Sequence, residues 1–160
     1  MVKGEFNKEL EEKMAVAVHD FYRELCKKEG WPVKYDMDYL ELPGEIKADN
    51  LAAATRIPKV LSSAGLSVVP DDDPGAAITQ EALEDNIEVL AKAEHKGWME
   101  QKEQSGWTYG TQRDDGRKIH PALIPYKALS KEDREKDRNA VRNYPTIVRL
   151  AGYKITHSTK

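Results

Sequence analysis

The chain has 160 residues, 39% of them hydrophobic and 33% charged, which is enough to bury one core or two small ones. No hydrophobic run approaches the ~18 residues of a membrane span and the N-terminus lacks the stretch of a secretory signal, so we expect a soluble cytoplasmic protein without a membrane partner. The single cysteine, Cys26, excludes an internal disulfide, which fits a reducing compartment.

Charge is divided unevenly between the two parts of the chain. Residues 1–110 carry 13 Lys and Arg against 22 Asp and Glu, a net of −9, whereas residues 111–160 carry 12 against 6, a net of +6. Duplex nucleic acid is not expected as a partner, because the acidic part would repel a long polyanion. The C-terminal third is the expected place for an anionic ligand, unless both sets of charges simply lie on solvated helix faces.

The first predicted element is a helix from about Phe6 to Glu29. Gly30 follows at the position of a helix C-cap, since glycine adopts a positive φ without steric cost. A short extended segment and a second helix come next, and we expect Pro58 to kink or break that helix at Thr55–Ile57. The hydrophobic residues of the first helix recur every three to four positions and form one face: Leu10, Met14, Ala17, Phe21 and Leu25.

The segment Val69–Gly75 is rich in proline and aspartate and is typical of an exposed linker. We therefore divide the chain into a first domain at residues 1–70, an acidic linker at 71–81 and a second domain at 82–160. The second domain begins with a predicted helix from about Ala82 to Gln104.

The rest of the second domain follows the order of the first. Gly106 caps the first helix, and residues 122–126 predict a strand whose proline confines it to a sheet edge. A second helix begins at Ser130, a hydroxyl cap with a carboxylate three residues on, and ends at Gly152. Pro145 is expected to kink or break it at Arg142–Tyr144.

The two domains are copies of one unit. At an offset of 76, six of the 18 residues at 14–31 are identical in the second copy, where chance gives roughly one. At an offset of 87, six of the 24 residues at 42–65 are identical. The difference, 87 − 76 = 11 residues, is an extra loop after Trp107. We therefore predict a mainly α fold with short β-strands, in which two tandem repeats of helix, short strand and helix pack about a pseudo-twofold axis.

The second copy resembles a known family. Residues 83–90 read LEDNIEVL and are followed by HKGW at 95–98, which is similar to the opening helix of the RyR repeat of ryanodine receptors. The strings GWTYGTQRDD at 106–115 and HPALIPY at 120–126 resemble its central signature, and RN at 138–139 with LAGY at 150–153 resemble its closing helix. The first copy lacks the TYG, RDD and HP elements.

The resemblance implies a free-standing pair of RyR repeats, of the prokaryotic or phage type, and it does not imply that the chain conducts calcium. In the receptors such repeats come in pairs in the cytoplasmic part, where a pair accepts an adenine nucleotide. Related prokaryotic domains are associated with sensing nucleotide-derived signals in defence systems. We therefore expect a non-catalytic ligand-binding module for a nucleotide or a related anionic heterocycle, with a protein-interaction or homo-oligomerisation module as the alternative.

The signature loop has the residue types that a nucleotide needs. An aromatic face stacks on a base, worth roughly 1–3 kcal/mol, and arginine binds phosphate through two parallel hydrogen bonds. The expected ligand-binding residues, with Trp31 facing the others across the axis, are Trp107, Tyr109, Arg113, Asp114, Arg117, His120, Arg138 and Trp31. Arg138 belongs to a basic stripe with Arg134 and Arg142, for which Glu132 or Asp133 are the candidate acidic partners.

Structural roles remain open for several of these residues. Core packing explains Trp107 as well as ligand stacking does. His19 and His95, at matched positions, are expected to bond backbone carbonyls, and Asp114–Gly116 has the composition of a turn. No catalytic, metal-binding or cofactor motif is recognised, so neither catalysis nor a metal or cofactor is expected.

Overall fold

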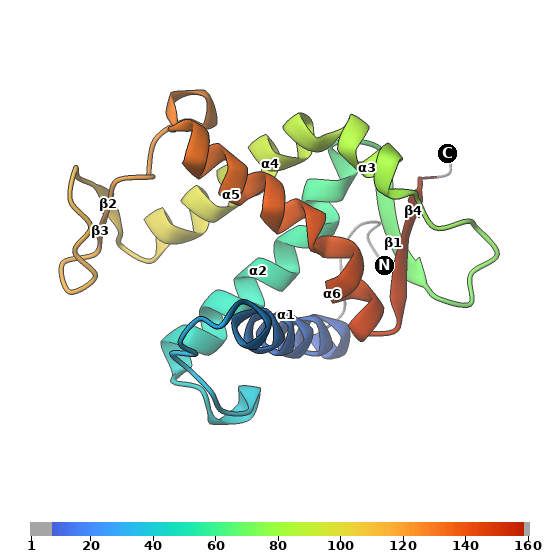
Figure 1. The fold of residues 1–160 in the computed structure, drawn as a ribbon, viewed down its shortest axis with the longest axis horizontal. Coiled ribbons are helices and arrows are strands. Elements are labelled where there is room, and N and C mark those ends of the chain that lie inside the picture. Colours follow the sequence, from blue (N-terminus) through green and yellow to red (C-terminus); the bar gives the residue numbers. More distant parts are fainter. Residues whose placement is uncertain (1–7, 159–160) are drawn as a thin grey trace. The chain divides into compact units, whose positions relative to one another are not determined.

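The computed structural model describes residues 8–158. It is mainly helical with a few short strands, as predicted (Figure 1). The described residues form two compact units. Unit 1 runs up to Ile78 and resumes at Asn143, whereas unit 2 spans Thr79–Arg142.

Among its described residues, unit 1 has three helices and a short 3₁₀ helix. α1 (Lys8–Glu29) packs against α2 (Gly44–Ser62) and against α6 (Tyr144–Leu150), with η1 (Tyr39–Glu41) beside α1. The largest fully buried side chains of this unit come from these three helices and from the residue that begins the strand after α2: Met14, His19, Ile57, Leu61, Val148 and Leu66. Gly30 ends α1 at φ +73°, as its predicted cap position requires.

The two strands of unit 1 come from opposite ends of the chain. β1 (Leu66–Pro70) pairs antiparallel with β4 (Tyr153–His157), with Val68 opposite Ile155 at the centre. The two arrows lie side by side in Figure 1. Leu66 and Ile155 are each 2% exposed, so this ribbon closes one side of the core.

Unit 2 is built on α4 (Ile87–Gln104), which packs along α5 (Lys131–Arg142). α3 (Gln80–Asp85) precedes α4, and η2 (Tyr126–Ala128) precedes α5. Beyond the C-terminal end of α4, the short strands β2 (Thr108–Tyr109) and β3 (Ile119–His120) hold a projecting loop (Figure 1).

Proline acts differently in the two long second helices. The break predicted near Pro145 is present, since α5 ends at Arg142, α6 begins at Tyr144, and Pro145 lies in the first turn of α6. Proline is tolerated there because the first turn donates no intrahelical bonds. At Pro58 we expected a kink or a break, and there is no break, since α2 runs from Gly44 to Ser62 with the proline ring buried inside it.

Two further predictions in unit 2 were wrong. The helix expected at residues 82–104 is interrupted at Asn86, whose side-chain amide donates to the carbonyl of Ala82 and ends α3. The strand expected at residues 122–126 does not form. The backbone amide of Ala122 donates to the His120 ring and the carbonyl of Ile124 accepts from His95, so side chains rather than a neighbouring strand satisfy these groups.

Among the described helices, none has the length and hydrophobicity to cross a bilayer.

Candidate ligand-binding site

The centre of unit 2 is a buried histidine on α4. His95 is 3% exposed. Its Nε2 donates to the Ile124 carbonyl at 2.7 Å, and its Nδ1 lies 3.1 Å from Asp137 Oδ2. Burial lowers the pKa of His95, but the bonds to Asp137 and Ile124, with the charges of Asp137 and Glu94, outweigh it and raise the pKa above its usual value. The geometry thus favours an imidazolium that donates from both nitrogens.

A pocket of about 400 Å³ opens beside this histidine. Its wall is one face of α4 together with the segment that leads into η2, and its lining residues are Val89, Lys92, Ala93, His95, Lys96, Met99, Pro125 and Tyr126. The volume lies within the ~300–1,000 Å³ usual for small-molecule sites. Lys92 and Lys96 are exposed, and neither forms an ion pair with another described residue.

The aromatic wall of the pocket is fixed by a hydrogen-bonded chain. Tyr126 Oη donates to Glu88 Oε2 at 2.8 Å, and Arg138 Nε donates to Glu88 Oε1 at 2.7 Å. Burial, followed by the bond to Glu88, raises the pKa of Tyr126 to about 12. Arg138 therefore reaches the pocket only through Glu88 and Tyr126.

Further aromatic rings continue from His95 toward the signature loop. The His95 ring stacks on Trp98 with centroids 5.6 Å apart, and Trp98 meets His120 edge-on at 5.0 Å. Trp107 lies 6.2 Å from His120, and Lys102 Nζ lies 4.9 Å from the Trp107 ring centre. Burial and the charges of nearby cations hold the pKa of His120 below its usual value. This half-buried cluster ties the loop to α4.

The family model for the RyR domain matches residues 74–157, more than half of the chain. The chain belongs to the RyR domain family. The match confirms the resemblance found in the sequence, and it includes all of α3, α4 and α5.

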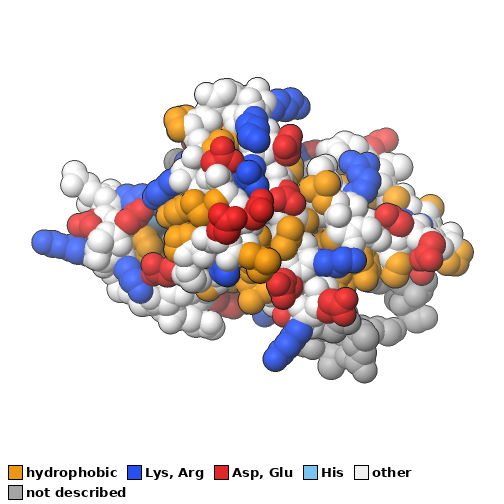
Figure 2. Space-filling model, turned by 90° about the horizontal axis from the view of Figure 1, so that it is seen from below, with side chains coloured by type: hydrophobic (Ala, Val, Ile, Leu, Met, Phe, Trp, Pro, Cys, Tyr) orange, Lys and Arg blue, Asp and Glu red, His pale blue; other side chains and the backbone are white. Residues whose placement is uncertain are grey.

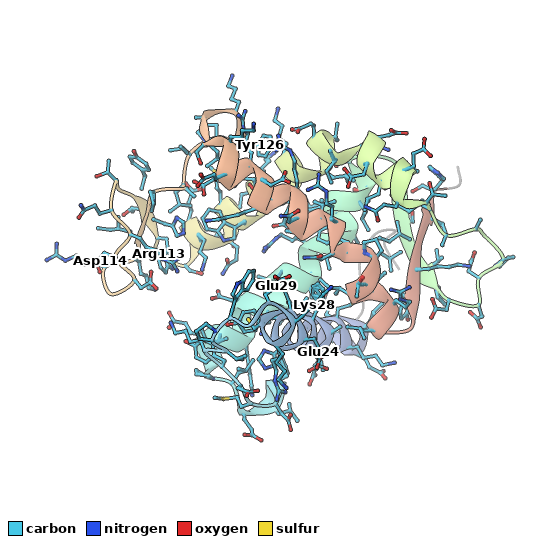
Figure 3. All side chains as sticks on the ribbon, in the orientation of Figure 1. Glu24, Lys28, Glu29, Arg113, Asp114 and Tyr126 are labelled. Carbon is cyan, nitrogen blue, oxygen red and sulfur yellow. The ribbon has the colours of Figure 1, made fainter. Side chains whose placement is uncertain are left out.

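Within the RyR domain, the charged residues of the signature loop bind one another. Arg113 Nε lies 2.8 Å from Asp115 Oδ1, and Arg117 Nε lies 3.7 Å from Asp114 Oδ2. Asp114 Oδ1 also accepts from the backbone amide of Arg117, which confirms the predicted turn. Tyr109 is 55% exposed. Figure 3 shows Arg113 and Asp114 on this loop, well apart from Tyr126 at the pocket.

Two of the three arginines in the basic stripe on α5, Arg138 and Arg142, are also paired. Arg142 bonds Glu84 of α3 and Glu135, and Arg138 bonds Glu88 and Glu135. The acidic partners are thus not the predicted Glu132 and Asp133. On the face of the molecule drawn in Figure 2, acidic and basic side chains are interspersed and form no continuous basic field.

Of the expected ligand-binding residues, the structure brings Trp107 and His120 together and places Tyr109, Arg113, Asp114 and Arg117 on the exposed loop. Trp31 belongs to unit 1 and is 55% exposed, and its position opposite Trp107 stays a prediction. Sequence analysis missed the residues that line the pocket. The only signal for Lys92 and Lys96 is their spacing of four on one helix face, which is equally typical of a solvated surface.

Proposed function

We propose that this RyR-domain chain is a non-catalytic module that binds a nucleotide or a related anionic heterocycle in the pocket on α4. The observation that carries the proposal is the combination of a pocket of about 400 Å³ with two lysines at its edge, Lys92 and Lys96. Hydrophobic walls accept a ring, and ammonium groups attract phosphate. We also propose that the module acts in the cytosol, because its single cysteine fits a reducing compartment.

The side chains on the walls suit a flat ring. One face of α4 provides Val89, Ala93 and Met99. The start of η2 provides Pro125 and Tyr126. The thioether of Met99 adapts to irregular shapes and contacts aromatic rings favourably. Because Glu88 holds the Tyr126 hydroxyl at 2.8 Å, that aromatic side chain is ordered before a ligand arrives, which lowers the entropy lost on binding.

The charge pattern favours the pocket over the predicted loop. Arg113 and Arg117 already bind Asp115 and Asp114 within the loop, so a phosphate there would compete with carboxylates. Neither Lys92 nor Lys96 is paired with a carboxylate of another described residue that a phosphate would have to displace. The imidazolium form of His95 adds positive charge at the base of the pocket, although Asp137 balances it.

We also propose that the fold is a duplication, with the pocket in the second copy. His19 Nε2 bonds the Met37 carbonyl at 2.6 Å, as His95 bonds Ile124, and both pairs match under the sequence offsets of 76 and 87. The offset of 87 also matches three structural features of the copies, which are the first residue of each 3₁₀ helix, a glycine with positive φ, and a strand. The matched pairs are Tyr39 with Tyr126, Gly65 with Gly152, and Leu66–Pro70 with Tyr153–His157.

The strand pairing supports a local twofold relation between the copies. Val68 lies opposite Ile155 at the centre of the antiparallel ribbon, and these residues are 155 − 68 = 87 positions apart, which is the offset between the copies. Each strand therefore pairs with its own counterpart about the central pair, as a pseudo-twofold axis requires.

The test is a thermal-shift measurement with nucleotides on the wild type and on two variants. A ligand at 100 times its Kd stabilises by about 2.7 kcal/mol, or roughly 5–10 °C for a chain of this size. Ala93→Leu fills the pocket with a helix-compatible side chain, whereas Trp107→Ala removes the aromatic face of the signature loop. Analysis of the ligand after long incubation checks that it is not turned over.

The two variants separate the two locations. A shift that is lost in Ala93→Leu and kept in Trp107→Ala supports the pocket. The opposite pattern moves the site to the signature loop, and no shift with any nucleotide in the folded wild type removes the proposal.

A second candidate is a protein-interaction or homo-oligomerisation module. It is favoured by two large hydrophobic side chains of unit 1 that face solvent, Trp31 at 55% and Leu40 at 72% exposure. Light scattering of the wild type and of Leu40→Ser as they elute from a size-exclusion column, over a range of concentrations, tests this candidate. A monomer at every concentration removes homo-oligomerisation.

A further inference from the structure

The two copies differ at the positions that give the pocket its charge. Under the offset of 76, Val16 and Asp20 stand in the first copy where Lys92 and Lys96 stand in the second. Both copies nevertheless form the long first helix and the bond from its histidine to a backbone carbonyl. The helix and the histidine bond therefore form in the first copy without lysines at these positions, so the two lysines are particular to the second copy.

The hydrophobic end of the pocket is also particular to the second copy. Arg23 stands at the position of Met99, and Asp38 at the position of Pro125. Arg23 lies 3.0 Å from Asp36 and 3.4 Å from Asp38, so an ion-pair cluster occupies this place in the first copy. In the second copy the same place is lined by a thioether and a proline ring, which offer no charge.

Most polar side-chain groups of the pocket are already engaged. Both nitrogens of His95 lie against acceptors, the Ile124 carbonyl and Asp137. Tyr126 donates its hydroxyl proton to Glu88. The side-chain groups that remain are the two ammonium groups, which only donate. A protein distinguishes one base from another through hydrogen bonds to the donors and acceptors on the edge of the base. Among the side chains that line the pocket, the oxygen of Tyr126 is the one acceptor left for a donor on such an edge.

The two lysines are placed to share one anionic group. Lys92 and Lys96 are four residues apart on α4, which separates their Cα atoms by about 6 Å along the helix. Their long side chains can converge, and a phosphate accepts charge-assisted hydrogen bonds from both.

Resting on the proposed function, we propose that the pocket selects ligands by their phosphate and by the size of their ring, without distinguishing one base from another. Lys92 and Lys96 hold the phosphate. Val89, Met99 and Tyr126 accept a flat ring through hydrophobic contact.

Calorimetric titration of the wild-type chain with four probes tests this inference. The probes are AMP, GMP, naphthyl phosphate, which has a ring without a base edge, and adenosine, which has a base without a phosphate. AMP, GMP and naphthyl phosphate are expected to bind with Kd values within tenfold of one another, and adenosine more than tenfold more weakly than AMP.

Matched variants identify the groups responsible. The double variant Lys92→Gln with Lys96→Gln is expected to weaken AMP and naphthyl phosphate by the same factor, about tenfold or more. Lys59→Gln, which removes an exposed helical lysine of unit 1, is expected to leave both Kd values unchanged. Circular dichroism confirms that each variant is folded.

The outcomes separate this inference from the proposed function. If AMP binds but GMP or naphthyl phosphate is more than tenfold weaker, the base is distinguished and the inference is overturned while ligand binding stands. Adenosine binding as tightly as AMP, or an unchanged Kd in the double variant, also overturns it. Binding by none of the probes overturns this inference, whereas the proposed function falls only if no nucleotide gives a thermal shift.

Discussion

Replacing Asp137 by asparagine should change how the stability of unit 2 depends on pH. In the wild type the imidazolium of His95 donates to Asp137 at 3.1 Å and to the Ile124 carbonyl at 2.7 Å. Asparagine suits a neutral His95 instead, because its amide can donate to Nδ1 while Nε2 keeps its proton for Ile124. Asparagine is also the residue of the first copy at this position, where Asn50 stands in place of Asp137.

The size of the effect follows from the bond that is changed. A hydrogen bond to a charged group contributes about 1.5–3 kcal/mol and a neutral one about 0.5–1.5 kcal/mol, so the difference is about 1.5 kcal/mol. Asp137 is only 18% exposed, so solvent screening is limited. The folded state raises the pKa of His95, so this stabilisation is fully present below the unfolded value of about 6.5 and is lost as the pH rises through the folded value.

Urea denaturation of the wild type and of Asp137→Asn, from pH 5 to pH 9, measures this. We expect the variant to be about 1.5 kcal/mol less stable at pH 5, which corresponds to about 3–6 °C in Tm, and the difference to shrink as the pH rises. A difference that stays constant over this range would refute the imidazolium–carboxylate pair.

Two further substitutions test the loop and the aromatic wall. Gly110→Ala should destabilise the loop by about 1–3 kcal/mol, because an added Cβ would clash with Ile119 Cγ2. Gly116→Ala, whose Cβ meets nothing nearer than 3.5 Å, should melt close to the wild type. Equal melting temperatures of the two variants would contradict this. Tyr126→Phe should cost about 0.5–1.5 kcal/mol through the lost bond to Glu88, and ultraviolet titration should lose the tyrosine with a pKa of about 12.

The sequence predicts those features that depend on neighbours along the chain. The caps at Gly30 and Gly106, the Ser130 cap and the histidine–carbonyl bonds are local or repeat between copies, and all are present. The break at Asn86 was missed because the hydrophobic pattern continues through it.

The pocket was missed for a different reason. It forms only when α4 meets Pro125 and Tyr126, about 30 residues further on, and no periodicity within either segment reports that contact.

The basic stripe shows what sequence spacing could have added. Arg138 and Arg142 are four residues apart on α5, and their partners Glu88 and Glu84 are also four apart on the preceding helices. Considered alone, the arginines predict an anion site. Considered with the glutamates, the matched spacing predicts two helices held together by ion pairs, which is the arrangement found.

The pairing of β1 with β4 has a consequence for the order of folding. Unit 1 takes its second strand and α6 from residues that follow unit 2 in the chain, so it cannot be completed until unit 2 has been synthesised. At about 5–20 residues per second, the 87 residues between Val68 and Ile155 correspond to a delay of about 4–17 s. During that time the edge of β1 is unpaired and Leu66, which is buried in the folded chain, is not yet covered by β4. The N-terminal part of the nascent chain is therefore the part most in need of protection from aggregation.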